Sequence, residues 1–173
     1  MIEMLSSNLA SGIFGAILGS LIANWLTIKN EKIKLTMDFH KEWNNHEMNA
    51  QRRVGYHCIK LYPDTKYSEL TNSDEKGSLS VFTVLRFYER LWHCFNTNRL
   101  DKQLTATLFY QDFYWWYFIS FSTSLKASKD DWPAYNHIVN LKIKFQEYTS
   151  EADFQIYQKK FNEKYNSYVS NKP

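Results

Sequence analysis

The feature that most constrains this chain is a long run without any charged residue, from Met4 to Ile28. The hydrocarbon core of a bilayer is about 30 Å thick, and a helix needs roughly 20 residues at 1.5 Å each to cross it. The stretch from Leu9 to Ile28 has that length. We therefore predict one transmembrane helix within residues 1–28, and a separate domain over residues 29–173.

Three alternatives compete for this segment. A cleaved signal peptide normally has a basic start, whereas the only early charge here besides the amino terminus is Glu3. A helix lying on the membrane surface needs lysines on its polar face, and this run has none. A buried helix of a soluble protein is the third alternative.

Small residues gather on one side of the predicted span. Residues four apart share a helix face; two neighbouring faces of this helix are small or weakly polar, and the other two are bulky. Lipid gives no reason for such a face, but close approach by a second helix does. We predict association with a copy of the chain or with another membrane protein. The residues of this association face are Ser11, Gly12, Gly15, Ala16, Gly19, Ser20 and Ala23.

Lysines set the expected orientation. Lys29, Lys32, Lys34 and Lys41 follow the span, and a basic flank stays in the cytoplasm. We expect the amino terminus outside the plasma membrane and residues 29–173 in the cytoplasm.

Residues 29–173 are typical of a helical domain. The chain holds 12 Phe, 12 Tyr and 6 Trp, with only 5 Gly and 3 Pro, so it has the side chains for a core and few loop residues. The predicted fold is all-α, a single N-terminal transmembrane helix continuing into a cytoplasmic bundle of about five helices.

Local signals place the boundaries of these helices. The first helix continues past the membrane with an apolar stripe of Leu35, Phe39 and Trp43, and breaks at 44–47. The next helix stops before Pro63, and residues 62–77 read as the longest loop. Further helices are expected at about 78–97, 104–125 and 151–168, with Asp101 capping the second of these. Trp132-Pro133 opens another helix between the last two.

The segment 104–125 has two interpretations. Its single charge, Asp112, makes a second membrane span conceivable. That charge near the bilayer midplane costs about 3 kcal/mol, and a helix that is apolar on most sides also suits the centre of a soluble bundle. We favour the buried central helix.

Acidic residues on apolar helices raise the question of catalysis. Glu89 and Asp112 are candidates for a hydrolytic acid pair, but we expect each to bind a basic partner, because an unpaired buried carboxylate is costly. The candidate partners are Arg52, Arg53, Arg86 and Arg90. The specific prediction is an ion pair between Glu89 and Arg53.

Two His-Cys pairs, His57-Cys58 and His93-Cys94, are the only metal-like pattern. Adjacent helical residues point about 100° apart, so one zinc ion does not readily gather all four. We expect the cysteines to pack as small apolar residues, and we expect neither a metal nor a cofactor. Neither cysteine carries the marks of a nucleophile.

The aromatic run around residues 110–117 is a candidate pocket or interface. Its candidate residues are Tyr110, Asp112, Trp115 and Trp116. Such aromatics stack nucleobases in some proteins, although they more often form core or protein interfaces. The formal net charge of +3 is spread without a basic tract, so nucleic acid is not an expected partner.

The order of these features resembles an uncharacterised family of small bacterial proteins, classed as a domain of unknown function. An N-terminal span is followed by a helix with paired arginines, Arg52-Arg53, and then by an aromatic and acidic pattern; the likeness covers roughly residues 29–147. The positions that carry it are Phe87, Tyr88, Glu89, Leu100, Asp101 and Trp115 or Trp116. The resemblance implies a bacterial, membrane-associated helical protein, and it implies no activity.

The sequence therefore predicts a non-enzymatic, membrane-anchored adaptor or regulator whose partners are the lipid bilayer and a second membrane helix. A sensor for a cytosolic ligand, possibly a nucleotide, with a membrane effector role in stress or phage defence is one alternative. An enzyme that uses Glu89 and Asp112 is the other.

Overall fold

The computed structural model describes the backbone of residues 2–62, 65–125 and 134–170. Within the helices, some side chains lie outside the description, namely those of residues 2–14, 68, 122–125, 134, 157, 161 and 164–170. Ser11 and Gly12 of the predicted association face, and the Trp132-Pro133 helix start, therefore fall outside the described residues.

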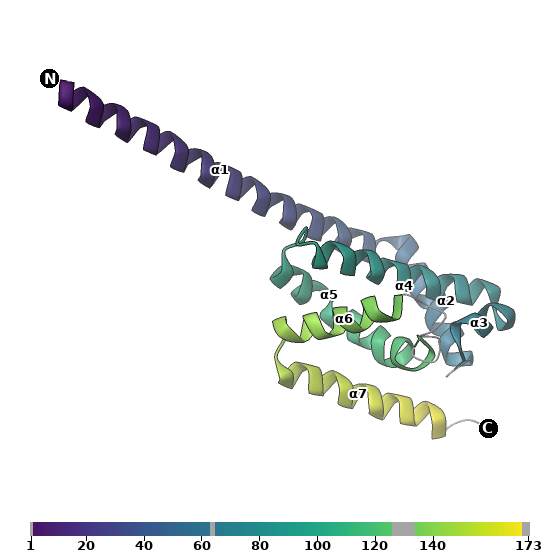
Figure 1. Ribbon diagram of the computed structural model, residues 1–173. Helices are drawn as coiled ribbons and strands as arrows, with labels where there is room; N and C mark the ends of the chain where they lie inside the picture. Colours follow the sequence, from purple (N-terminus) through teal and green to yellow (C-terminus); the bar gives the residue numbers. More distant parts are fainter. Residues whose placement is uncertain (1, 63–64, 126–133, 171–173) are drawn as a thin grey trace.

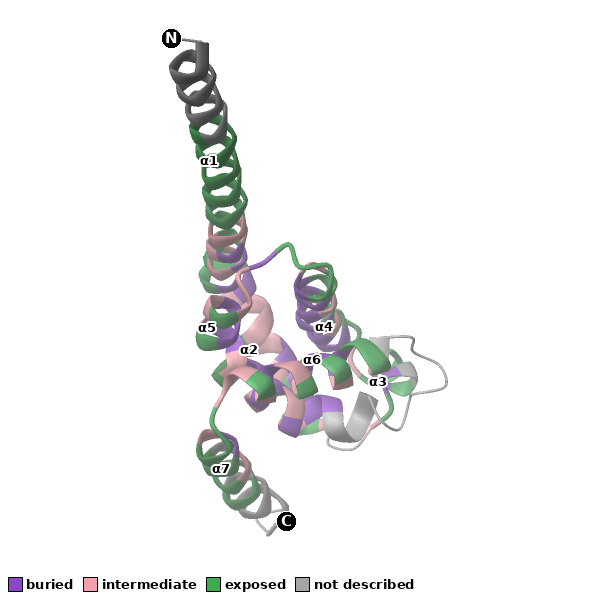
Figure 2. Cartoon of the chain, turned by 60° about the vertical axis from the view of Figure 1, so that its left-hand side comes forward, coloured by how far each residue is buried: buried purple, intermediate pink, exposed green. Residues whose placement is uncertain are grey.

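Every described element is a helix, as the sequence predicts. The longest is α1, Ile2–Asn44, which projects far beyond the other helices (Figure 1). Residues 15–28 of α1, here called the stem, are exposed on all sides (Figure 2). The predicted continuation of the first helix past residue 28 is confirmed.

Among the residues that the structure describes, no helix is both long enough and apolar enough to cross a membrane.

The last part of α1 enters the bundle at Thr36. This side chain is fully buried, and its hydroxyl oxygen accepts a hydrogen bond from the backbone N–H of Asp101 at 3.1 Å. Phe39 and Trp43, one and two turns further on, are buried among the bundle aromatics. The predicted apolar stripe is thus the face by which α1 docks.

Side-chain caps begin three of the following helices. Asn45 accepts from the N–H of Met48 at 2.7 Å and starts α2, His46–Leu61. Asp74 starts α4, Glu75–Asn96, and Asp101 starts α5, Lys102–Trp116, by accepting from Leu104 at 2.9 Å. The break after Asn44, the stop before Pro63 and the Asp101 cap are all confirmed.

Two elements differ from the sequence-based expectation. The region 62–77 is not one loop, because it contains the short helix α3, Tyr67–Ser73, which inserts Tyr67 and Leu70 into the core. After α5 the chain continues as a π-helix, η1, Tyr117–Leu125. The remaining helices are α6, Ala134–Tyr148, and α7, Glu151–Ser170.

Among the described elements, the most extensive packing is between α2 and α4. A Cβ added to Gly55 would lie 3.2 Å from the backbone nitrogen of Val81, and one added to Gly77 would lie 2.5 Å from the Cβ of Cys58. These two glycines allow the helix backbones to approach, and larger side chains do not fit there without a shift.

Helix α5 lies at the centre, as the buried-helix interpretation predicts. It contacts α1, α4, α6 and α7, and it buries Phe109, Phe113, Tyr114 and Trp116. Its exposed side carries Gln111 and Asp112. Asp112 is therefore a surface carboxylate, with about half of its side chain exposed, rather than the buried acid that the apolar sequence around it indicated.

Candidate functional site: a basic and aromatic pocket between α2 and α5

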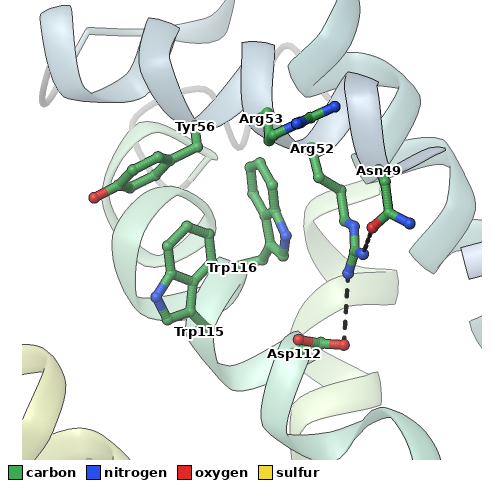
Figure 3. A pocket seen from close by; sticks show the side chains of 7 residues that line it. All are labelled: Asn49, Arg52, Arg53, Tyr56, Asp112, Trp115 and Trp116. Carbon is green, nitrogen blue, oxygen red and sulfur yellow. Dashed lines mark hydrogen bonds and ion pairs between the residues drawn. The ribbon is translucent and has the colours of Figure 1, made fainter. Parts of the chain in front are cut away.

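An open pocket of about 540 Å³ lies between α2 and α5. Figure 3 shows Trp116 at its centre, with Arg52, Asn49 and Asp112 on one side and Tyr56 and Trp115 on the other. The seven lining residues are Asn49, Arg52, Arg53, Tyr56, Asp112, Trp115 and Trp116. Three of the four candidate pocket residues from the sequence, Asp112, Trp115 and Trp116, thus come together here.

Tyr110, the fourth candidate, does not line this pocket. Tyr110 lies one turn before Tyr114 on α5. Its half-buried ring contacts that of Tyr114 edge to face, with the ring centroids 6.3 Å apart. The sequence analysis missed Asn49 and Tyr56. The signal that locates them is helical spacing, because residues 49, 52, 53 and 56 share one face of α2.

The polar side of the pocket is a network centred on Asp112. Its carboxylate accepts a 2.7 Å hydrogen bond from the indole N–H of Trp43 and lies 3.6 Å from the guanidinium of Arg52. Arg52 also stacks over the Trp43 ring at 4.3 Å and donates to Asn49. One acid therefore holds together the end of α1, α2 and α5.

The aromatic side of the pocket is a row of rings. Tyr56 and Trp115 are half-buried with centroids 5.0 Å apart, and Trp115 meets Trp116 edge to face at 5.3 Å. Trp116 is buried and stacks on Phe121 of the π-helix. Trp116 is therefore the floor of the pocket, and Tyr56 and Trp115 are the rings that a ligand can reach.

Tyr88 lies in the core behind this network. Burial, and then the charge of Asp112, raises the pKa of its phenol well above the ordinary value. Within the described part of the chain, its hydroxyl has no hydrogen-bond partner. The phenol stays neutral and serves as a packing ring, since it contacts Trp43 and Phe113.

The predicted ion pair between Glu89 and Arg53 needs correction. Glu89 lies 3.9 Å from Nδ1 of His137 on α6, and Arg53 makes no ion pair among the described residues. Arg53 is instead exposed at the edge of the pocket. The expected kind of pairing does occur for the other acid, since Asp112 pairs with Arg52.

These contacts also bear on the proposed acid pair. Asp112 binds Arg52 and Trp43, whereas Glu89 faces α6. In the described part of the chain, no hydrogen bond or ion pair joins the two carboxylates.

The His-Cys pairs do not converge in the described residues, where no three metal-ligating side chains come together. Cys58 is fully buried in the α2–α4 contact, as expected of a small apolar residue. Burial, and then the nearby charge of Asp74, raises the pKa of its thiol to about 11. Cys94 is half-buried against the core.

The described part of the predicted association face is open. Gly15, Ala16, Gly19, Ser20 and Ala23 are exposed, and a Cβ added to Gly15 or Gly19 would meet nothing within 4 Å. The space beside this face is therefore free for a second helix.

Comparison of the chain with models of known protein families, with curated proteins and with solved structures finds no match. Function is therefore inferred from the stem and the pocket themselves.

Proposed function

We propose that this protein is a membrane-anchored helical adaptor or regulator. The stem, together with the charge-free sequence that precedes it, forms a single-pass anchor, and the bundle of residues 29–173 lies on the cytoplasmic side of a bacterial inner membrane. The lysine-rich segment between stem and bundle, Lys29 to Lys34, supports this orientation.

The observation that carries the proposal is the exposure of the stem. Its large apolar side chains are 45% to 60% exposed: Ile17, Leu18, Leu21, Ile22, Trp25, Leu26 and Ile28. At 100° per residue they cover about half of the helix circumference, and the stem projects away from the bundle, so no described part of the chain covers them (Figure 1). Covering them with lipid gains on the order of 10 kcal/mol, taking about half of the burial energy of each side chain.

Trp25 and Lys29 support the position of the boundary. The ammonium group of Lys29 lies 5.3 Å from the Trp25 ring. Tryptophan favours the membrane interface, and lysine keeps its charge in the headgroup region. This pair is expected where the anchor leaves the lipid.

The small face supports association within the membrane. Gly15 and Gly19 leave room for a second backbone, and such faces are typical of packed transmembrane helices. Because α1 is unbroken from the stem to Asn44, pairing or rotation of stems is transmitted directly to the bundle. That rigid link is the basis for a regulatory or adaptor role.

Flotation of the full chain with phospholipid vesicles tests the anchor. The unaltered protein should float with the vesicles at high salt and at alkaline pH. Leu21→Arg places a charge in the lipid at a cost of roughly 3 kcal/mol. The ratio of vesicle-bound to free protein should therefore fall by about 100-fold. Leu79→Arg is the matched control, because Leu79 is equally exposed, at 58% against 60%, but lies on α4 of the bundle. Equal loss in the two variants, or no flotation of the unaltered chain, would contradict the proposal.

A further inference from the structure

The pocket between α2 and α5 has an excess of positive charge. Two arginines face one carboxylate there. Arg52 is already engaged by Asp112, Asn49 and the Trp43 ring. Arg53 is exposed, and in the described part of the chain no carboxylate pairs with it. The charge of Arg53 is therefore available to an anion that enters the pocket.

Reachable aromatic faces lie in the same pocket. Tyr56 follows Arg53 by one turn of α2, and its ring contacts that of Trp115 across the gap to α5. Both rings are only half-buried. A planar ring that enters the pocket can stack on them while Trp116 closes the floor.

The size of the pocket limits the occupant. Small-molecule sites usually measure roughly 300–1,000 Å³, and this one measures about 540 Å³. That volume suits a ligand larger than a single ring or a free phosphate.

We propose that this pocket binds an aromatic anion of nucleotide size. Arg53 binds the anionic group, and Trp115 and Tyr56 stack against the planar ring. Asp112 lies on the far side of Trp116 from these rings (Figure 3), where it keeps Arg52 in place and accepts from polar groups of the ligand. The inference does not depend on membrane anchoring, because every residue involved belongs to the bundle.

The pocket also touches the end of α1. Asp112 and Arg52, which line it, both hold the ring of Trp43. The pocket is therefore directly adjacent to the junction through which α1 joins the bundle.

Calorimetric titration of the full-length protein in detergent tests the site. The probes are adenosine and guanosine monophosphate, the aromatic carboxylate 1-naphthoate, adenosine and inorganic phosphate. Saturable binding of the monophosphates or of naphthoate is expected. Which of these binds shows whether the anionic group that the pocket prefers is a phosphate or a carboxylate. Adenosine and phosphate should each bind at least about tenfold more weakly than the monophosphate, because each lacks one of the two recognised groups.

Substitutions locate the binding. Arg53→Gln should weaken binding of the preferred anion by about tenfold. The matched control is Arg86→Gln, because Arg86 is an exposed arginine on α4 outside the pocket, and it should bind as the unaltered protein does. Trp115→Leu should weaken binding by a similar factor while the far-ultraviolet dichroism stays helical.

Three outcomes would overturn the inference. They are the absence of saturable binding by any aromatic anion at millimolar concentration, equal binding of inorganic phosphate and the monophosphate, and equal weakening by the two arginine substitutions.

Discussion

Trp25 and Trp43 lie on the same helix, yet their surroundings are opposite. Trp25 in the stem is 59% exposed, with the ammonium group of Lys29 over its ring, whereas Trp43 is completely buried against Phe87 and Tyr88. The bundle buries most of its large apolar side chains against one another, although a few such as Leu79 stay exposed. The stem has the same kind of side chains, and the described chain does not cover them.

The glycines show the same difference. Gly55 and Gly77 sit where α2 and α4 touch, and a methyl group on either would press on a neighbour. Gly15 and Gly19 have empty space around them. In the bundle, glycine enables a contact that is already made, and in the stem it borders space that no described residue fills. The lesson is that residue type alone does not tell whether packing is complete.

The largest expected effect separates the two tryptophans. Trp43→Ala removes a buried ring and the hydrogen bond that its indole N–H donates to Asp112. It should lower the free energy of unfolding of the bundle by about 3–5 kcal/mol. Trp25→Ala should leave it unchanged, because that ring touches no part of the bundle. Urea titration of the full chain in detergent, followed by far-ultraviolet dichroism, measures both. Equal losses would mean that the stem is part of the cooperative fold.

A second prediction compares two glycines. Gly77→Ala forces the new methyl group against Cys58 and Asp74 and should destabilise the bundle by about 1–3 kcal/mol. Gly19→Ala should leave the denaturation midpoint unchanged or slightly higher, because alanine favours helix. It should at the same time weaken stem association, as crosslinking in membranes would show. A stable Gly77→Ala protein would mean that α2 and α4 are less closely packed than described.

A smaller effect is expected from pH. The thiol of Cys58 has its pKa raised on folding from 9.0 to about 11, so the native state holds the proton more tightly than the unfolded state. Its contribution to stability is complete below pH 9 and is lost as the pH rises toward 11. The thiol alone should lower the free energy of unfolding by about 1 kcal/mol between pH 9 and 10.

Cys58→Ala provides the control for this pH effect. In that variant the fall between pH 9 and 10 should be smaller by about 1 kcal/mol. The fall that remains belongs to the phenols of Tyr67, Tyr88, Tyr114 and Tyr117, whose pKa values are also raised. An identical pH profile in the two proteins would show that the thiol is not the group responsible.

The parts of the fold that sequence predicts well are those that local chemistry decides. Asn45 and Asp101 cap helices through hydrogen bonds that span only three residues, and the stripe that ends at Trp43 follows helical spacing. Helix α3 escaped prediction because its sequence is polar and rich in turn residues, with Tyr67 and Leu70 as its buried apolar side chains. The sequence shows no break between α5 and the π-helix, so the change of helix type was not predicted.

The candidate site was predicted only in part, because it depends on how distant helices face each other. The aromatic run on α5 identified Trp115 and Trp116. Which arginine meets which acid depends on the rotation of α2 relative to α5, and the sequence does not reveal that rotation. In the structure Arg52 pairs with Asp112, whereas Arg53 is exposed and lines the pocket.

Single-cysteine accessibility along α1 tests the central claim, that lipid covers the stem, most directly. In a background of Cys58→Ala and Cys94→Ala, the full chain in pure phospholipid vesicles would carry one cysteine in place of Leu18, Ile22, Leu26, Asn30 or Asp38. A membrane-impermeant maleimide should label positions 30 and 38 rapidly and positions 18, 22 and 26 only after detergent is added. Equal labelling of all five positions without detergent would contradict the account.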